Sequence, residues 1–187
     1  INKYIKKHES YILYYLRGYI LSEKEKISES EFFFKKSISL NKNFWNSYDL
    51  LLKQYEKQSR LKNFKNLIDS AKIIFKNNER VFYYESLYFF RVNDYSQSLN
   101  ILIDKETEKK FLSQENKAFL SDYFNLLSRV YEKLGFYNQS YNFAIKRNKT
   151  ILDFKENKKF NKELILKTIS AYKKFFDKKN KLKSHII

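Results

Sequence analysis

Apolar residues along the chain recur three and four positions apart in successive short stretches, and polar segments separate these stretches. That spacing places the apolar side chains on one face of an α-helix, so it predicts a series of amphipathic helices. We expect them in consecutive pairs, at residues 11–23 and 28–40, 45–57 and 61–76, 79–92 and 95–103, and 114–134 and 137–150. The pattern therefore predicts an all-α fold class.

The residue pattern also repeats every 34 positions. Three stretches align at this step, and a fourth aligns after an insertion near 104–111, which we expect to form a loop or extra helical turns. Three of the aligned columns are Gly18, Leu52 and Ser86; Leu21, Tyr55 and Phe89; and Phe34, Ile68 and Leu102. A period in the thirties is typical of helix pairs that cannot bury their apolar face alone, so neighbouring pairs must stack. We expect a right-handed α-solenoid of antiparallel helix pairs with a concave inner surface.

The period divides the chain into segments. We interpret residues 1–10 as the end of a preceding helix and residues 155–187 as a lysine-rich capping helix and tail. Between them, residues 11–154 form four repeats, at 11–44, 45–78, 79–112 with the insertion, and 113–154. Because the chain contains no methionine, we expect it to be a piece of a longer protein.

Several residues are typical of helix ends. Ser28 and Glu31 match a capping box at the start of a helix, and Ser113 is a candidate N-cap for the helix that ends near 134. Gly135 is expected to end that helix, because glycine adopts the left-handed backbone conformation of a C-terminal cap. The dipeptide at 93–94, Asn-Asp, predicts a turn between the helices of the third pair.

The composition agrees with a single packed helical domain. There is no proline, there are two glycines, and 43% of the residues are hydrophobic against 32% charged, which argues against a disordered chain. The absence of cysteine excludes disulfides and cysteine metal sites, and it favours a reducing, cytoplasmic compartment. No apolar run approaches the roughly 18 residues of a membrane span, so we expect no transmembrane segment.

The net charge of +17 raises the possibility of a polyanionic partner. Lysine supplies nearly all of this charge, and lysine, asparagine, isoleucine, phenylalanine and tyrosine are together abundant, as codon drift in an AT-rich genome would produce. Arginine, which phosphate recognition prefers, is scarce. We therefore expect no nucleic-acid partner, and we keep RNA or acidic-membrane binding through the lysines of 155–183 as a third hypothesis.

The repeats resemble tetratricopeptide repeats (TPRs) over residues 11–150. The closest local match is Tyr131 to Gly135 followed by Tyr137, Ser140 and Ala144. Small residues occur where two helices must approach closely, and these residues are Gly18, Ser30, Ser86, Ser98, Ser128 and Ser140. The second repeat departs from the pattern because Leu52 and Phe64 occupy the small positions, and Ala144 replaces an aromatic residue in the fourth. Rings such as Phe34, Tyr48, Tyr55 and Tyr131 are assigned to the core.

The resemblance implies a binding groove on the inner face, formed by side chains of the first helix of each pair. The residues it places there are Tyr15, Tyr19, Asn46, Asp49, Lys53, Arg80, Tyr83, Leu87, Asn125 and Arg129. Such a mixture of amides, charges and rings suits an extended peptide. The leading hypothesis is therefore a protein-interaction scaffold whose partner is a protein or peptide.

We expect no catalysis by this chain, and no cofactor or metal. Its two histidines, His8 and His185, lie near opposite ends, and there is no glycine-rich phosphate-binding loop. The enzyme alternative rests on residues 143–176, which are similar to the segment that joins TPRs to a sulfotransferase domain in some bacterial proteins. That resemblance implies a substrate-presenting arm, with the catalytic domain beyond residue 187.

Overall fold

The computed structural model describes residues 10–113 and 116–157. All of the secondary structure in these residues is helical, as the hydrophobic pattern predicted. The helices are α2 (Tyr11–Glu23), α3 (Ile27–Leu40), α4 (Trp45–Lys57), α5 (Leu61–Ile74), α6 (Glu79–Arg91), α7 (Tyr95–Ile103), α8 (Lys105–Leu112), α9 (Lys117–Lys133) and α10 (Tyr137–Asn157). The expected end of a preceding helix at 1–10, apart from residue 10, and the expected capping helix and tail, apart from residues 155–157 at the end of α10, lie outside the described residues.

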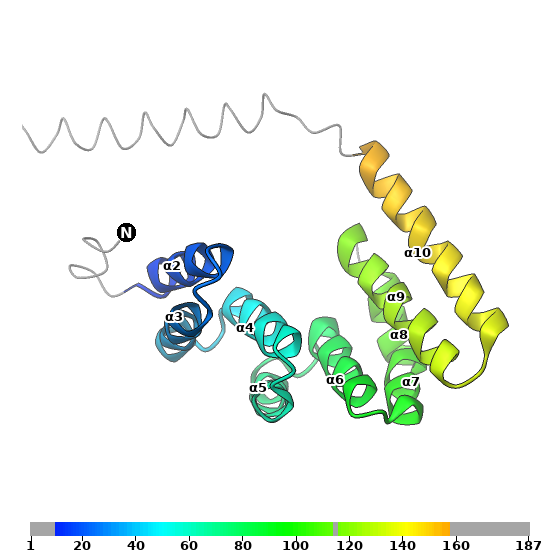
Figure 1. The fold of residues 1–187 in the computed structure, drawn as a ribbon, viewed down its shortest axis with the longest axis horizontal. Helices are drawn as coiled ribbons and strands as arrows, with labels where there is room; N and C mark the ends of the chain where they lie inside the picture. Colours follow the sequence, from blue (N-terminus) through cyan, green and yellow to red (C-terminus); the bar gives the residue numbers. More distant parts are fainter. Residues whose placement is uncertain (1–9, 114–115, 158–187) are drawn as a thin grey trace, which may run out of the picture.

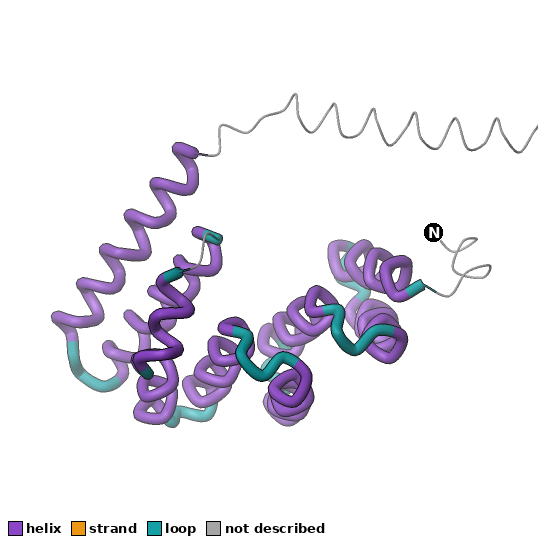
Figure 2. The backbone as a smooth tube through the Cα atoms, turned by 180° about the vertical axis from the view of Figure 1, so that it is seen from behind, coloured by secondary structure: helices purple, strands orange, loops and turns teal. Residues whose placement is uncertain are grey.

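Each helix packs mainly on its neighbours along the chain. From α2 to α7 every helix contacts the next one, and α9 contacts α7, α8 and α10. Figure 1 shows the helices arranged as a curved row from α2 to α10, and Figure 2 shows the same row from behind. Helices far apart in the chain are therefore also far apart in this row.

The same turn closes the first, second, third and last pairs of helices. In each turn one residue has a positive φ, and these residues are Glu25, Ser59, Asn93 and Gly135. The amide of the following residue then donates a hydrogen bond of 2.9 Å back to a carbonyl in the preceding helix, as from Lys26 to Leu21 and from Asp94 to Phe89. This bond satisfies a carbonyl that the helix end would otherwise leave unpaired. The predicted end at Gly135, with a φ of 82°, is one instance of the motif.

Two predicted helix starts are wrong. Helix α3 begins at Ile27, so Ser28 lies inside it and does not form the capping box with Glu31. Ser113 follows the end of α8, where its Oγ donates a hydrogen bond of 2.9 Å to the Lys110 carbonyl. The N-cap of α9 is instead Asn116, whose Oδ1 accepts a hydrogen bond of 3.2 Å from the Phe119 amide. Helix α10 also runs past the predicted end at 150.

The insertion near 104–111 forms a helix of its own, α8. Asp104 caps it, because its Oδ2 accepts hydrogen bonds from both the amide (3.1 Å) and the hydroxyl (3.0 Å) of Thr107. The ring of Phe111 is fully buried and stacks on Tyr123 of α9 with a centroid distance of 4.3 Å. The extra residues therefore extend the core toward α9.

Close approach of paired helices uses small residues, as the sequence predicted. In the third pair the Ser86 hydroxyl donates to the Ser98 carbonyl at 3.0 Å, and the two hydroxyl oxygens lie 2.8 Å apart. In the last pair Ser128 makes the same bond to the Ser140 carbonyl at 2.9 Å. The corresponding residues of the second pair, Leu52 and Phe64, are both fully buried. The second pair therefore fills with large side chains the space where the third and last pairs place serine hydroxyls.

Aromatic rings make up much of the core. Phe34, Tyr48 and Tyr55, which were assigned to the core, are 0%, 2% and 3% exposed. Tyr131 is only partly buried, and its ring stacks on Phe143 of α10 with a centroid distance of 5.5 Å. Burial of rings in these positions removes them from any role as exposed base-stacking platforms.

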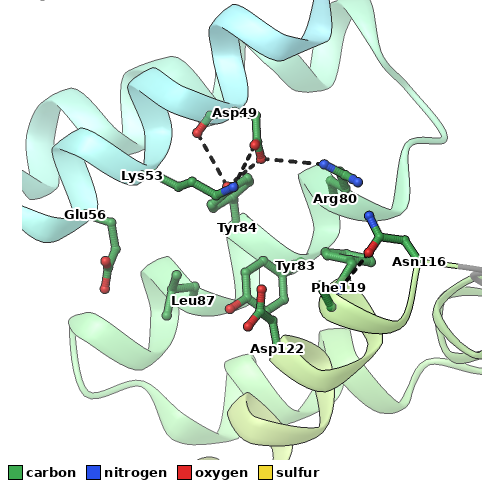
Figure 3. Close-up of a pocket in the computed structure, with 11 residues that line it drawn as sticks. Asp49, Lys53, Glu56, Arg80, Tyr83, Tyr84, Leu87, Asn116, Phe119 and Asp122 are labelled. Atoms are coloured by element: carbon green, nitrogen blue, oxygen red, sulfur yellow. Dashed lines mark hydrogen bonds and ion pairs between the residues drawn. The ribbon is translucent and has the colours of Figure 1, made fainter. Parts of the chain in front are cut away.

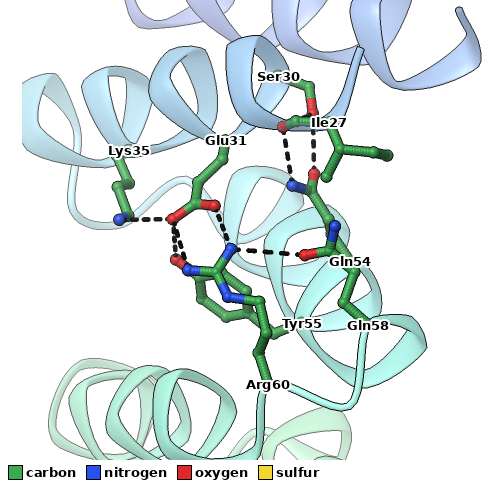
Figure 4. A network of polar contacts seen from close by, with 8 residues as sticks. All are labelled: Ile27, Ser30, Glu31, Lys35, Gln54, Tyr55, Gln58 and Arg60. Carbon is green, nitrogen blue, oxygen red and sulfur yellow. Dashed lines mark hydrogen bonds and ion pairs between the residues drawn. The ribbon is translucent and has the colours of Figure 1, made fainter. Parts of the chain in front are cut away.

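A polar network connects α3 with α4 and with the start of α5. The Glu31 carboxylate lies 2.5 Å from Arg60 Nη1 and 2.7 Å from Lys35 Nζ, and it accepts a hydrogen bond of 2.8 Å from the Tyr55 hydroxyl (Figure 4). Burial alone would raise the pKa of Glu31. The hydrogen bonds from Arg60, Lys35 and Tyr55 outweigh burial and lower this pKa to about 2. The carboxylate is therefore ionised throughout the ordinary pH range and holds the two helix pairs together.

The network makes stability dependent on acid pH. Because the folded pKa of Glu31 lies below its ordinary value of 4.5, the carboxylate stabilises the fold above about pH 4.5, and this contribution is lost as the pH falls toward 2. Glu31→Gln is expected to lower the free energy of unfolding by about 1 to 2 kcal/mol at pH 7, after solvent screening is allowed for. Urea unfolding at pH 7 and pH 2.5 would measure the difference, which should shrink at the lower pH.

Glu29→Gln is the matched control on the same helix. Its side chain is 51% exposed, and its carboxylate pairs with Lys26 at 3.3 Å. A surface pair of this kind contributes between about 0 and 1 kcal/mol, so Glu29→Gln should change stability little at either pH. Equal effects of the two substitutions at pH 7 would contradict the role given to Glu31.

Candidate functional site

A cavity of about 290 Å³ lies between α4, α6 and α9. We call it the central pocket, and Figure 3 shows it from close by. Its lining residues are Asp49, Lys53, Glu56, Arg80, Tyr83, Tyr84, Leu87, Asn116, Ala118, Phe119 and Asp122. The volume is near the lower end of the range for small-molecule sites, and it suits a single long side chain better than a large cofactor.

Helical spacing brings these side chains together. Asp49, Lys53 and Glu56 lie four and three positions apart on α4, so they form one stripe along that helix. Arg80, Tyr83, Tyr84 and Leu87 form the facing stripe on α6. The N-terminal part of α9 closes the pocket, where the Asn116 cap fixes the start of the helix. The first helices of three successive pairs, α4, α6 and α9, therefore each supply one wall of the pocket.

Asp49 is the most connected residue of the pocket. Its Oδ1 accepts a hydrogen bond of 2.7 Å from the Tyr84 hydroxyl, and its Oδ2 lies 2.8 Å from Lys53 Nζ. Arg80 Nη1 is 3.9 Å from the same carboxylate. Burial raises the pKa of Tyr84 well above its ordinary value, and the Asp49 charge raises it further. Tyr84 is therefore a neutral donor that ties α6 to α4.

A second ion pair lies beside the pocket. Arg91, at the end of α6, pairs with Glu56 of α4, and the distance from its Nε to Glu56 Oε1 is 2.7 Å. Glu56 lines the pocket, but its charge is compensated by this arginine. The contacts of Asp49 and Glu56 each cross from α4 to α6, so they also fix the spacing of these two walls.

Asp122 and Tyr83 face the pocket without such partners. Among the described residues, the Asp122 carboxylate makes no hydrogen bond or ion pair, and the Tyr83 hydroxyl makes no hydrogen bond. Although Asp122 is exposed at the pocket mouth, the surrounding walls displace water and raise its pKa, which Lys53 opposes and Asp49 reinforces. Burial raises the pKa of Tyr83 strongly, with the charge of Asp122 as the next cause.

Aromatic rings form the remaining wall. The ring of Tyr83 meets those of Tyr84 and Phe119 nearly edge to face, with centroid distances of 5.5 Å in both cases. The Arg80 guanidinium lies 5.2 Å from the Phe119 ring centroid, in the position of a cation–π contact. The pocket thus already holds one cation against an aromatic face.

Five of the ten groove residues expected from the sequence line this pocket, namely Asp49, Lys53, Arg80, Tyr83 and Leu87. Leu87 is only 7% exposed, so it offers little more than part of the floor. The other five lie elsewhere. Tyr19 and Asn46 are exposed on α2 and α4, and Tyr15 packs on Phe44 with a centroid distance of 5.2 Å.

The two expected groove residues of α9 contact other side chains instead of lining the pocket. Asn125 Oδ1 accepts a hydrogen bond of 2.8 Å from Arg147 Nη1 of α10. The Arg129 guanidinium lies 4.5 Å from the ring centroid of Phe90, a residue that is 6% exposed. Both side chains therefore strengthen contacts between helices.

Six lining residues are not among the ten expected groove residues, namely Glu56, Tyr84, Asn116, Ala118, Phe119 and Asp122. Asn116 carried a usable signal, because asparagine before an apolar helical stretch is a strong N-cap, as Ser113 also is. Placing the helix start at Asn116 would have brought Ala118 and Phe119 into consideration. Tyr84 carried no such signal, since its neighbour Tyr83 occupied the expected groove position.

No family model matches the chain, and no curated protein matches it significantly. Within residues 10–113 and 116–157, no group of three or more His, Cys, Asp or Glu side chains could hold a metal ion. In the same residues no helix combines the length and the apolar character needed to cross a bilayer. His8, His185 and most of both the lysine-rich end and the sulfotransferase-like stretch lie outside the described part of the chain.

Proposed function

We propose that the chain is a right-handed solenoid of TPR-like helix pairs, and that it binds a peptide or protein segment along its inner face without catalysing a reaction. The central pocket is the observation that supports this proposal. It is lined from α4, α6 and α9, which are the first helices of successive pairs. A segment that spans these helices would contact three units at once.

The chemistry of the lining suits a peptide. Asn116 presents a side-chain amide, Lys53 and Arg80 present cations, and Asp122 presents a carboxylate, so both backbone and side-chain groups of a peptide find partners. The partly buried ring of Tyr83 supplies apolar contact area that anchors a bound side chain.

Blocking the pocket should abolish binding. Ala118 is exposed and lines the pocket, so Ala118→Trp would place an indole in the opening without disturbing the core. Peptides would first be selected from a random library displayed on phage, with the folded chain as target. We expect Ala118→Trp to weaken their binding at least tenfold, as measured by fluorescence polarisation, because the indole occupies the volume that a peptide side chain would fill.

Ser96→Trp is the matched control. Ser96 is exposed on α7, a second helix that supplies no lining residue of this pocket. The control variant should bind the selected peptides as the unaltered chain does. Circular dichroism and thermal unfolding would establish that both variants fold. Selected peptides that bind Ala118→Trp and the unaltered chain equally, or a selection that enriches no peptide, would refute the proposal.

A further inference from the structure

The lining of the central pocket holds more carboxylates than cations, although the chain as a whole is strongly basic. Three carboxylates line it, from Asp49, Glu56 and Asp122, against two cations, from Lys53 and Arg80. The chain as a whole carries a net charge of +17. Because Arg91 pairs with Glu56, the remaining lining charges are two carboxylates and two cations, so the class of ligand depends on which of these charges lacks a partner.

Most of the pocket charges are already compensated. Asp49 lies 2.8 Å from Lys53 Nζ and 3.9 Å from Arg80 Nη1, and Glu56 pairs with Arg91. These contacts leave one lining carboxylate, Asp122, without a hydrogen bond or ion pair among the described residues. A cationic ligand group can therefore pair with Asp122, whereas an anionic one would have to compete with Asp49 for Lys53 and Arg80.

A second observation points to the same ligand. The Tyr83 hydroxyl also lacks a hydrogen-bond partner in the described part of the chain, and its side chain lies beside Asp122 (Figure 3). A phenol oxygen can accept a hydrogen bond from an ammonium or guanidinium group. The ring of Tyr83 adds aromatic surface, which attracts cations and packs against aliphatic stems. Arg80 already uses the Phe119 ring in this way at 5.2 Å.

We propose that the central pocket receives a lysine or arginine side chain of the bound segment, with Asp122 as its counter-ion and Tyr83 as a second acceptor. This inference rests on the proposed function, because it names the side chain by which the segment is held. The cavity of about 290 Å³ accommodates one such side chain, with its stem along the ring of Tyr83. Charge-assisted hydrogen bonds in a partly desolvated site make this contact specific for cations.

The test uses two phage libraries of random peptides that are identical except that one lacks Lys and Arg. Both are selected on the folded chain. We expect enrichment from the library with basic residues, and a conserved Lys or Arg among its selected peptides. Asp122→Asn should weaken binding of such a peptide about tenfold or more, since it removes the counter-ion while keeping the size of the side chain. Glu132→Gln, which removes an exposed carboxylate of α9 outside the pocket lining, should change the affinity less than twofold.

A double-mutant cycle makes the assignment specific. The conserved lysine of the selected peptide is replaced by norleucine, which has a similar stem and no charge, or the conserved arginine by citrulline. If Asp122 is the counter-ion, the uncharged peptide should no longer distinguish Asp122→Asn from the unaltered chain. Tyr83→Phe, which keeps the ring and removes the hydroxyl, should give a smaller loss that also depends on the charged peptide.

The failures of the two proposals are distinguishable. Peptides that lose binding to Ala118→Trp but carry acidic or neutral residues, and that bind Asp122→Asn normally, would overturn the cation inference while leaving the binding site in place. Peptides that are insensitive to Ala118→Trp would overturn the binding site itself. Equal losses with Asp122→Asn and Glu132→Gln would show a general effect of charge and would also overturn the inference.

Discussion

Replacing Gly18 by valine is expected to lower the free energy of unfolding of the first helix pair by about 3 kcal/mol. A Cβ atom at this position of α2 would lie 2.7 Å from two ring carbons of Phe34 and 3.3 Å from Phe33 Cβ. Phe34 is 0% exposed, so its ring cannot turn aside without disturbing the packing of α2 on α3. Amide hydrogen exchange along the chain would measure the loss of protection, which should be largest in α2 and α3.

The location of the effect is as informative as its size. Helix α2 packs mainly on α3 and α4, so helices at the other end of the row should keep their protection. Ser28→Val provides a control, because Ser28 is an exposed residue of α3 and the substitution adds similar bulk at the surface. It should change stability by about 0.5 kcal/mol or less. Equal loss of protection in the two variants would contradict the close approach at Gly18.

Phe64→Ala is expected to lower the free energy of unfolding by about 4 kcal/mol, because it removes a fully buried ring and leaves a cavity. Phe64 lies on α5, and its ring meets Tyr84 of α6 edge to face with a centroid distance of 6.0 Å. Tyr84 in turn donates to Asp49 at the central pocket. The substitution should therefore also lower the affinity of the central pocket for any ligand. Urea unfolding followed by circular dichroism would measure the loss.

Phe32→Ala is the control for the same change of side chain. Phe32 is 61% exposed, so its removal leaves no cavity and should cost less than about 1 kcal/mol. If the two alanine variants were equally stable, Phe64 could not be the residue that fills the space between the second and third pairs.

The sequence located most helices to within one or two residues of their ends. The predicted range 45–57 coincides with α4, and the turn after α6 falls at the predicted Asn93 and Asp94. These predictions succeeded because they rest on local rules. Apolar spacing defines a helix face, and residues that tolerate a positive φ define the turn. The small residues at Ser86 and Ser98 also marked a close contact correctly, because that requirement repeats with the period.

The sequence failed where two local choices were nearly equivalent. Ser113 and Asn116 are both good N-caps, and only Asn116 caps α9. The stretch at 104–111 is strongly charged and has no long apolar stripe, so it predicted a loop as readily as a helix. It forms α8 where Phe111 stacks on Tyr123 of another helix. The Asp104 cap favours the helix locally, and the buried contact of Phe111 with another helix, which no local pattern encodes, favours it further.

The sequence by itself determined that the described chain is helical, where its paired helices turn, and which stripe of each first helix was a candidate for binding. Only the tertiary structure decided which stripes meet in one pocket, that Asp49 is occupied by Lys53 and Tyr84, and that Asp122 is left without a partner. The physical reason is the different sequence range of the two kinds of interaction. Helix patterns depend on residues three and four positions apart, whereas the distances between α4, α6 and α9 depend on the volumes packed between them.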